Sequence, residues 1–144
     1  MIENFEFYLD NNMVKRTSPS RENGTALMAR AYSRLEYVRG QKVTKETATF
    51  IFEDIYEVLR EGSQALMELK GFKPYSHEAQ VAFLRDVYKL RLDLVSTFDR
   101  FRVLRNKCVY GAGNVSIETC NEALRFTVSV LPELKKIFDS ETKP

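Results

Sequence analysis

A short segment near residue 105 carries side chains whose types and spacing suit phosphate chemistry. Arg105 is flanked by Arg102 and Asn106 at the end of a predicted helix. A guanidinium presents a fixed fork of donors that matches the geometry of a phosphate. Tyr110 projects far round the same helix, unless Gly111 unwinds the last turn and turns it back. The segment therefore offers a phosphate-binding site centred on Arg105.

The position of Arg105 on its helix leaves two interpretations open. At ~100° per residue, Arg105 falls inside the apolar stripe formed by Leu94, Phe98 and Phe101. A guanidinium on a core-facing line is costly unless it is paired or lies at an interface. It either pairs with a carboxylate of the longest predicted helix, or points into a cleft or a subunit interface. The candidate carboxylates are Asp54, Glu57 and Glu61.

The local charge adds weak support for phosphate binding. Residues 85–107 contain seven basic and three acidic side chains, a net charge of +4, whereas the whole chain has +2. Such a run is usually a solvated helix face, but it also suits a polyanion.

His77, which is the only histidine, lies at the start of another predicted helix, directly after the capping residue Ser76. It is interpreted as a partly exposed residue packed on the loop aromatics, with a catalytic role as the alternative. One imidazole excludes a histidine-based metal cluster, and Cys108 and Cys120 have no zinc-binding spacing. We expect no disulfide, metal or cofactor, and two cysteines that act as small apolar residues in a reducing cytoplasm.

The elements that must position these residues are predicted to be helical. Apolar residues recur at helical spacing throughout, and no alternating strand pattern exceeds three or four residues. Ser18 and Pro19 are typical of a helix start, and Thr44 is a plausible cap of the next helix. Gly71 and Pro74 indicate a break in the helix. The predicted helices span about 20–39, 44–70, 77–91 and 92–110, and a fifth begins after a cap at Ser116 and is bent or ended at Pro132.

These elements predict an all-α fold, an antiparallel up-and-down bundle of four to five helices. One domain covers residues 1–144, with an N-terminal arm at 1–17, read as a short helix or an extended segment, and a loose tail at 139–144. On the longest helix, Gly62 lies on the apolar stripe, where another helix can approach closely. The longest apolar run is about four residues, so we expect no membrane span and a cytoplasmic location.

Three segments of the chain resemble the HEPN superfamily, named for higher eukaryote and prokaryote nucleotide-binding domains. Residues 105–111, RNKCVYG, resemble its signature, in which an arginine, commonly followed by asparagine, precedes a histidine by four to six residues. Residues 50–61 resemble the long second helix of small prokaryotic HEPN proteins, and residues 71–79 resemble the loop and helix start that follow it. The resemblance covers roughly residues 20–138, and Tyr110 stands where the signature has histidine.

The resemblance implies a homodimer formed through the motif-bearing helices. In many HEPN proteins the arginine and histidine of both protomers form a cleft for metal-independent RNA cleavage, as in toxins and phage defence, and others partner a nucleotidyltransferase. The catalytic candidates here are Arg105 and Tyr110, and the phosphate-binding candidates are Arg102, Arg105 and Asn106. His77, Glu57 and Glu61 are possible supporting residues.

A phenol has a pKa of about 10, three units above pH 7, so only about a thousandth of it is in the basic form at that pH. It is therefore a poorer proton acceptor near pH 7 than a neutral imidazole. We therefore expect binding of RNA or a nucleotide with weak or absent ribonuclease activity. The alternatives are an active metal-independent endoribonuclease that uses Tyr110 or His77 for proton transfer, and a non-catalytic partner of a nucleotidyltransferase.

Overall fold

The computed structural model describes residues 2–144, and Met1 of the predicted N-terminal arm lies outside them. These residues form six helices and one small sheet, which confirms a mostly helical fold but gives more helices than the four to five predicted. The helices are α1 (Phe5–Asp10), α2 (Arg21–Arg39), α3 (Ala48–Lys70), α4 (His77–Asp86), α5 (Leu92–Tyr110) and α6 (Ile117–Glu141), and the strands are β1 (Val14–Arg16) and β2 (Phe72–Pro74).

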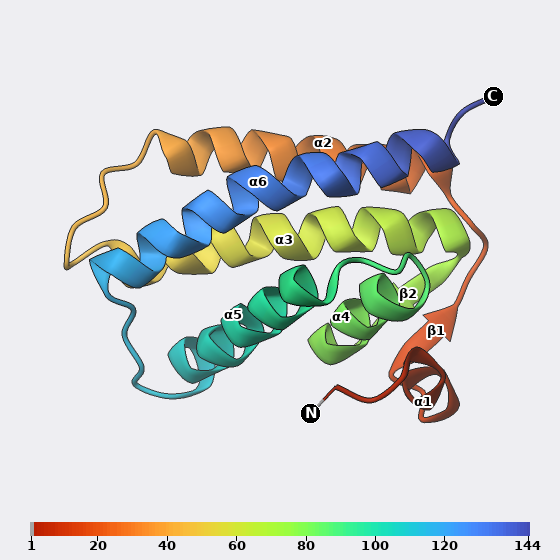
Figure 1. Cartoon of the computed structure of the whole chain (residues 1–144), viewed down its shortest axis with the longest axis horizontal. Coiled ribbons are helices and arrows are strands. Elements are labelled where there is room, and N and C mark those ends of the chain that lie inside the picture. The colour runs from red at the N-terminus through yellow and green to blue at the C-terminus, as the bar shows by residue number, and fades with distance from the viewer. Residues whose placement is uncertain (1) are drawn as a thin grey trace.

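Helix α3 is the centre of the molecule. In Figure 1, α2 and α6 lie along one side of α3, and α5 and α4 lie along the other. The chain runs in opposite directions in α2 and α3, and in the same direction in α3 and α6. Because α3 is covered on several sides, it is buried well beyond the single stripe that its periodicity predicts.

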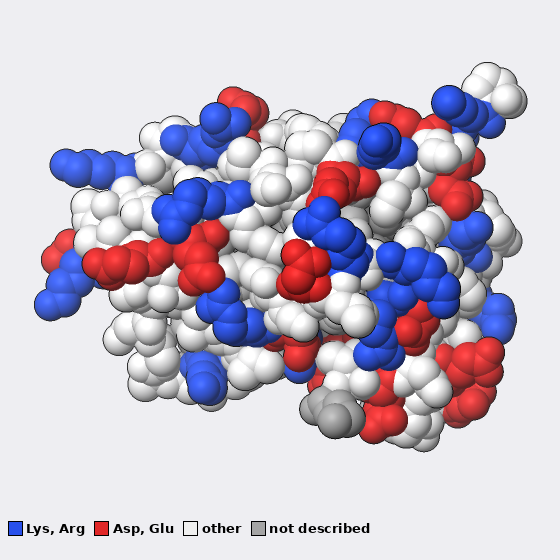
Figure 2. Space-filling model, viewed as in Figure 1, with Lys and Arg blue, Asp and Glu red and all other residues white. Residues whose placement is uncertain are grey.

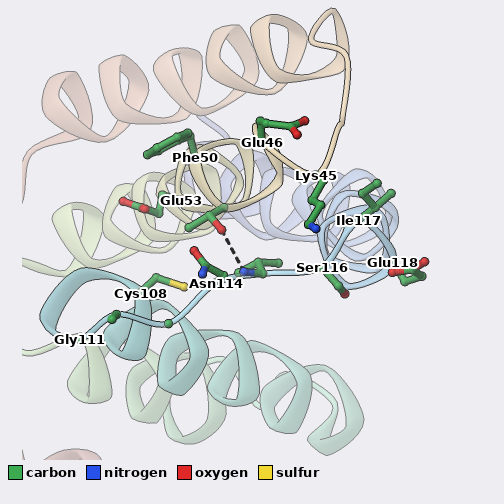
Figure 3. A pocket seen from close by; sticks show the side chains of 14 residues that line it. Lys45, Glu46, Phe50, Glu53, Cys108, Gly111, Asn114, Ser116, Ile117 and Glu118 are labelled. Carbon is green, nitrogen blue, oxygen red and sulfur yellow. Dashed lines mark hydrogen bonds between the residues drawn. The ribbon is translucent and has the colours of Figure 1, made fainter.

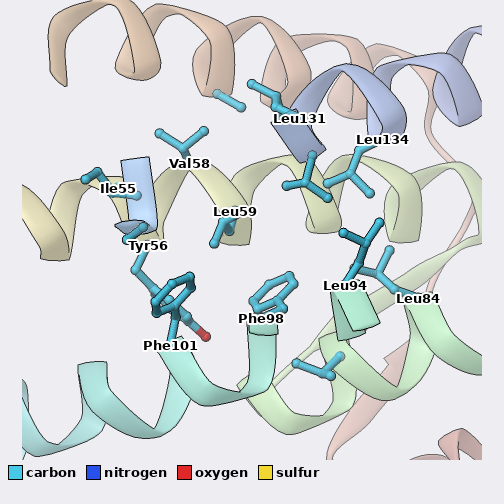
Figure 4. Close-up of a cluster of buried hydrophobic side chains, with 14 of the residues drawn as sticks. Ile55, Tyr56, Val58, Leu59, Leu84, Leu94, Phe98, Phe101, Leu131 and Leu134 are labelled. Carbon is cyan, nitrogen blue, oxygen red and sulfur yellow. The ribbon is translucent and has the colours of Figure 1, made fainter. Parts of the chain in front are cut away.

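Gly62 marks a close approach between α3 and α6. A Cβ atom added at Gly62 would lie 2.9 Å from Leu131 Cδ1 and 3.4 Å from Leu134 Cδ1. The predicted close helix contact is therefore present. Figure 4 shows Leu131 and Leu134 above α3, and Phe98 and Phe101 of α5 below it.

The N-terminal arm combines both predicted forms, a short helix and an extended segment, but its pairing was not predicted. Strand β1 pairs antiparallel with β2, with Val14 opposite Pro74 and Arg16 opposite Phe72. The strands have three residues each, too few to show an alternating pattern. This pairing fixes the segment that leads into α4 and His77.

Several predicted helix boundaries are wrong. Ser20, not Ser18, caps α2: its side chain accepts a hydrogen bond from Asn23 N. Thr44 bonds to Thr47 in a turn, and α3 begins only after Thr47. Helix α4 ends at Asp86 rather than at residue 91. After this end, Lys89 has a left-handed backbone conformation (φ 56°).

Helix α6 also differs from its prediction. Ser116 caps it as expected, but the helix continues through Pro132 to Glu141. Leu131 and Leu134 are buried beside the proline, and their packing against α3 offsets the backbone hydrogen bond that proline cannot donate. The predicted loose tail is therefore wrong for residues 139–141. None of the helices in residues 2–144 has the length and apolar character needed to cross a bilayer.

Candidate functional site

Arg105 lies where α5 passes α3, and it has no carboxylate partner among residues 2–144. Its guanidinium carbon is 5.7 Å from the centroid of the Tyr56 ring, in cation–π contact. The side chain is half-buried, so it lies less deeply than its predicted place inside the apolar stripe indicated.

The three carboxylates that might have paired with Arg105 are occupied by other arginines. Arg34 of α2 lies 3.5 Å from Asp54 and 2.8 Å from the buried Glu61. Arg60 lies 2.9 Å from Glu57 on the same helix. The paired interpretation of Arg105 is therefore wrong within the described chain. Glu57 pairs with Arg60 and Glu61 pairs with Arg34. The charge of Arg105 therefore remains available to an anion.

His77 is held beside this guanidinium by Tyr56. The His77 ring stacks on Tyr56 with 5.6 Å between centroids and 13° between planes, and its Nδ1 lies 3.1 Å from the Tyr56 hydroxyl. Burial raises the pKa of Tyr56, so the phenol keeps its proton at every ordinary pH. A protonated hydroxyl can donate to Nδ1, which places the proton of a neutral imidazole on Nε2, or accept from Nδ1–H, which leaves Nε2 as an acceptor.

The surroundings also favour neutral His77. Burial lowers the pKa of His77 below its ordinary 6.5, and the positive charge of Arg105 lowers it further. At pH 7 the imidazole is therefore uncharged, and in the tautomer in which Tyr56 donates to Nδ1, its Nε2–H can donate to a phosphate oxygen. To accept a proton at Nε2, His77 would need the other tautomer, in which Nδ1 donates to Tyr56. The geometry thus admits both phosphate binding and general-base catalysis at Nε2, one with each tautomer.

Arg102 is placed differently from Arg105, although both were predicted to bind phosphate. Its side chain is buried and lies 2.6 Å from Asp99 and 3.6 Å from Glu78. The other Glu78 oxygen accepts from the Tyr8 hydroxyl at 3.4 Å. Arg102 therefore joins α5 to α4 and to the N-terminal arm, and it positions the elements that carry Arg105 and His77.

Asn106 and Tyr110 line a separate shallow depression of about 440 Å³, together with Arg102, Val103 and Lys107. Tyr110 is 80% exposed and points away from the bundle, as the projection of its helix predicts. It does not line the depression that contains His77. The structure thus separates the two candidate proton-transfer groups, and only His77 is grouped with Arg105.

Tyr56 was not predicted as a site residue. It lies on α3 outside the stripe of Ile55, Val58 and Gly62, and Figure 4 shows its side chain reaching towards α5 beside Phe101. The signal in the sequence was the apolar character of α3 on more than one face, which is typical of a central helix. A tyrosine hydroxyl buried on a central helix needs a hydrogen-bond partner, and the partner of the Tyr56 hydroxyl is His77.

A larger depression, of about 1030 Å³, lies elsewhere. Figure 3 shows it between the start of α3, the loop at 111–116 and the start of α6, where Val115 N donates to Thr49 Oγ1 at 2.9 Å. Its lining carries three carboxylates, Glu46, Glu53 and Glu118, and one ammonium, Lys45. That charge balance opposes phosphate, so size alone does not make it the phosphate site.

In residues 2–144, no three histidine, cysteine or acidic side chains gather in a way that could hold a metal ion. Both cysteines are free, and burial raises the pKa of each thiol, which makes them poor nucleophiles. No protein-family model, curated protein or solved structure matches this chain. The likeness to HEPN proteins therefore rests on the sequence segments alone.

Proposed function

We propose that this protein is a HEPN-like homodimer that binds phosphates of RNA or a nucleotide, with weak or absent ribonuclease activity. The observation that carries the proposal is Arg105, a half-buried guanidinium without a carboxylate partner in residues 2–144, beside His77. A phosphate would receive two donors from Arg105 and one from His77 Nε2. Neither group needs to lose a protein partner in order to bind it.

The charge distribution supports local rather than long-range recognition. Figure 2 shows basic and acidic side chains interspersed over one face, without a broad field of one sign. The net charge of +2 agrees with this mixture. Affinity should therefore depend on the few groups at the site, and few counterions should be released on binding.

The outer side of α5 supports the proposed homodimer. Val103, Val109 and Tyr110 are between 41% and 80% exposed on this helix. Val103 and Tyr110 adjoin the depression that Asn106 lines. A second copy packed here would cover apolar surface and bring two motif-bearing helices together. Asn106 and Tyr110 would then contribute to the groove from the dimer contact.

The binding of a fluorescent single-stranded RNA hexamer, followed by anisotropy at several salt concentrations in EDTA, tests the proposal. We expect saturable binding whose log–log slope against salt is about −1.4 to −2.1, which corresponds to two or three phosphates of a single strand. RNA recovered after incubation should be intact. Absence of binding at low salt would contradict the proposal and favour the nucleotidyltransferase-partner alternative.

A second candidate function, metal-independent endoribonuclease, is favoured by one observation. Neutral imidazole is the form that accepts a proton, and His77 is neutral at pH 7 beside Arg105. In this reading Tyr56 accepts from Nδ1 and leaves Nε2 as the base. Cleavage of RNA in EDTA that is lost in His77→Gln would favour this function over binding alone.

A further inference from the structure

The two-stranded sheet places two lysines directly opposite each other. Lys15 is the central residue of β1 and Lys73 is the central residue of β2, and the antiparallel register pairs them. Both side chains are exposed, and they lie on the same face of the sheet because directly opposed residues point the same way. Like charges at opposed positions destabilise a pair of strands. A bound anion would relieve this repulsion.

No carboxylate of residues 2–144 forms an ion pair with either lysine, because the ion pairs in this part of the chain all involve other cations. Arg16, the next residue of β1, is also outside these ion pairs, and its guanidinium carbon lies 5.3 Å from the centroid of the Phe72 ring. Asp10 borders the adjoining depression, but it pairs with none of these cations. The sheet therefore carries three positive charges that are open to an anion.

Tyr75 connects this sheet to the proposed phosphate site. It borders a depression of about 490 Å³ that Lys15 and Arg16 also line, and it borders the smaller depression that contains His77. Its ring is 61% exposed on a fixed backbone, since Tyr75 N donates to the Met13 carbonyl at 2.9 Å just beyond the paired strands. The surface is thus continuous from the sheet to His77.

The distance along this surface suits a short nucleic-acid strand. Lys73 precedes His77 by four residues, so their backbones lie at most about 14 Å apart. About four stacked nucleotides, at about 3.4 Å each, span that length. A single mononucleotide is too short to reach both ends.

The chemistry of the surface favours single-stranded RNA over an acidic protein segment. Proteins that hold single strands combine cations along the backbone with exposed aromatic rings on which bases stack. Tyr75 supplies such a ring between the lysines and His77. An acidic peptide would use the cations alone and leave this ring without a function.

We propose that the β1–β2 sheet is a second contact surface for single-stranded RNA, so that one strand runs from Arg105 and His77 over Tyr75 to Lys15 and Lys73. The inference rests on the proposed function and narrows its ligand to an RNA strand of about four nucleotides or more. One phosphate lies at Arg105 and His77, a base stacks on Tyr75, and a further phosphate lies between the two lysines.

The test is the double variant Lys15→Gln/Lys73→Gln, with a fluorescent ribouridine hexamer as the probe in EDTA. We expect about five- to tenfold weaker binding at low salt and a salt slope less negative by about 0.7, because one phosphate contact of a single strand is lost. Removal of two opposed like charges should not destabilise the sheet, so the variant should fold. Circular dichroism checks the helix content.

The dinucleotide uridylyl-uridine separates this inference from the proposed function. It carries one phosphate and is too short to reach the sheet, so it should bind the double variant and wild type equally, as followed by the NMR signal of His77. Unchanged hexamer affinity in the double variant, with dinucleotide binding retained, would overturn the inference alone and leave the lysines as protection of exposed strand edges. Absence of dinucleotide and hexamer binding to wild type would overturn the proposed function as well.

The matched control is Lys42→Gln/Lys45→Gln, which removes the same charge from the connection between α2 and α3. Both lysines are exposed and outside the ion pairs of the described residues, and Figure 1 places this connection at the opposite end of α3 from β2. We expect less than about a twofold loss of hexamer affinity, because distant exposed charges are largely screened. Equal losses in the two double variants would overturn the inference.

Two further measurements separate RNA from an acidic peptide. Tyr75→Leu should weaken the hexamer about fivefold or more and keep the salt slope, because stacking releases no counterions. A peptide of six glutamates should bind wild type more weakly than the RNA hexamer does. Unchanged RNA affinity in Tyr75→Leu, or tighter binding of the peptide than of RNA, would overturn the proposed RNA surface.

Discussion

Replacing Arg105 with alanine should weaken RNA binding by about 10- to 100-fold, because a charge-assisted contact to phosphate contributes about 1.5–3 kcal/mol. Arg105 has no carboxylate partner in residues 2–144, so its removal leaves no buried carboxylate without its partner. The variant should therefore fold as wild type does. Anisotropy with the RNA hexamer measures the affinity, and circular dichroism checks the helix content.

The control for charge is Arg125→Ala on α6. Arg125 is exposed and has no ion pair among the described residues, so the substitution changes the net charge by the same amount. We expect less than about a twofold loss of affinity, since one distant exposed charge is largely screened. Arg105→Lys keeps the charge but not the two parallel donors of the guanidinium, so its loss of affinity should lie between those of Arg105→Ala and Arg125→Ala. Equal losses in Arg105→Ala and Arg125→Ala would show that binding follows net charge and not this site.

Gly71→Ala should lower the free energy of unfolding by about 3 kcal/mol or more. Gly71 ends α3 with φ 77°, a left-handed conformation that costs other residues about 1–2 kcal/mol. A Cβ atom there would lie 2.5 Å from the Thr17 carbonyl oxygen, and this is backbone that cannot rotate away. Thr17 N also donates to the Gly71 carbonyl at 2.7 Å, so the clash disrupts the link between the arm and β2.

Gly40→Ala is the matched control for this effect. Gly40 ends α2 with φ −83°, and an added Cβ would meet its nearest neighbour at an ordinary 3.5 Å. We expect a change within about 0.5 kcal/mol, and possible stabilisation because alanine restricts the unfolded chain. Urea unfolding of both variants measures the difference. A Gly71→Ala variant as stable as Gly40→Ala would contradict the described end of α3.

The sequence was sufficient for the helical class and for the positions of most helices, because apolar spacing and caps are local signals. Ser76, Ser116 and Gly71 end or begin helices where local chemistry predicts. Lys89 shows the limit of local signals: its left-handed backbone separates α4 from α5, although the residue type gives no indication of it.

The candidate site was predictable only in part. The helical projection placed Arg105 inside the apolar stripe, whereas the structure has it half-buried against the Tyr56 ring. Whether Arg105 pairs with a carboxylate of α3 depended on Arg34 of α2, which forms ion pairs with Asp54 and Glu61. The sequence of α5 gives no indication of these pairs. The contact between Tyr56 and His77 joins α3 to α4, and spacing along one helix cannot reveal it.

We propose that Arg105 and His77 share one phosphate, and His77 reports on that phosphate directly because it is the only histidine. Its imidazole gives a single titrating signal in proton–carbon NMR spectra of untagged protein. We expect a pKa below 6.5 in the free protein. A bound phosphate offsets the positive charge of Arg105 and favours the protonated ring, so the RNA hexamer should raise this pKa.

By linkage, binding then takes up protons, and affinity should increase as the pH falls through the pKa of bound His77. In Arg105→Ala the free protein should start from a higher pKa, and the hexamer should shift it little. A His77 pKa that stays unchanged when wild-type protein is saturated with RNA would contradict a phosphate shared by Arg105 and His77.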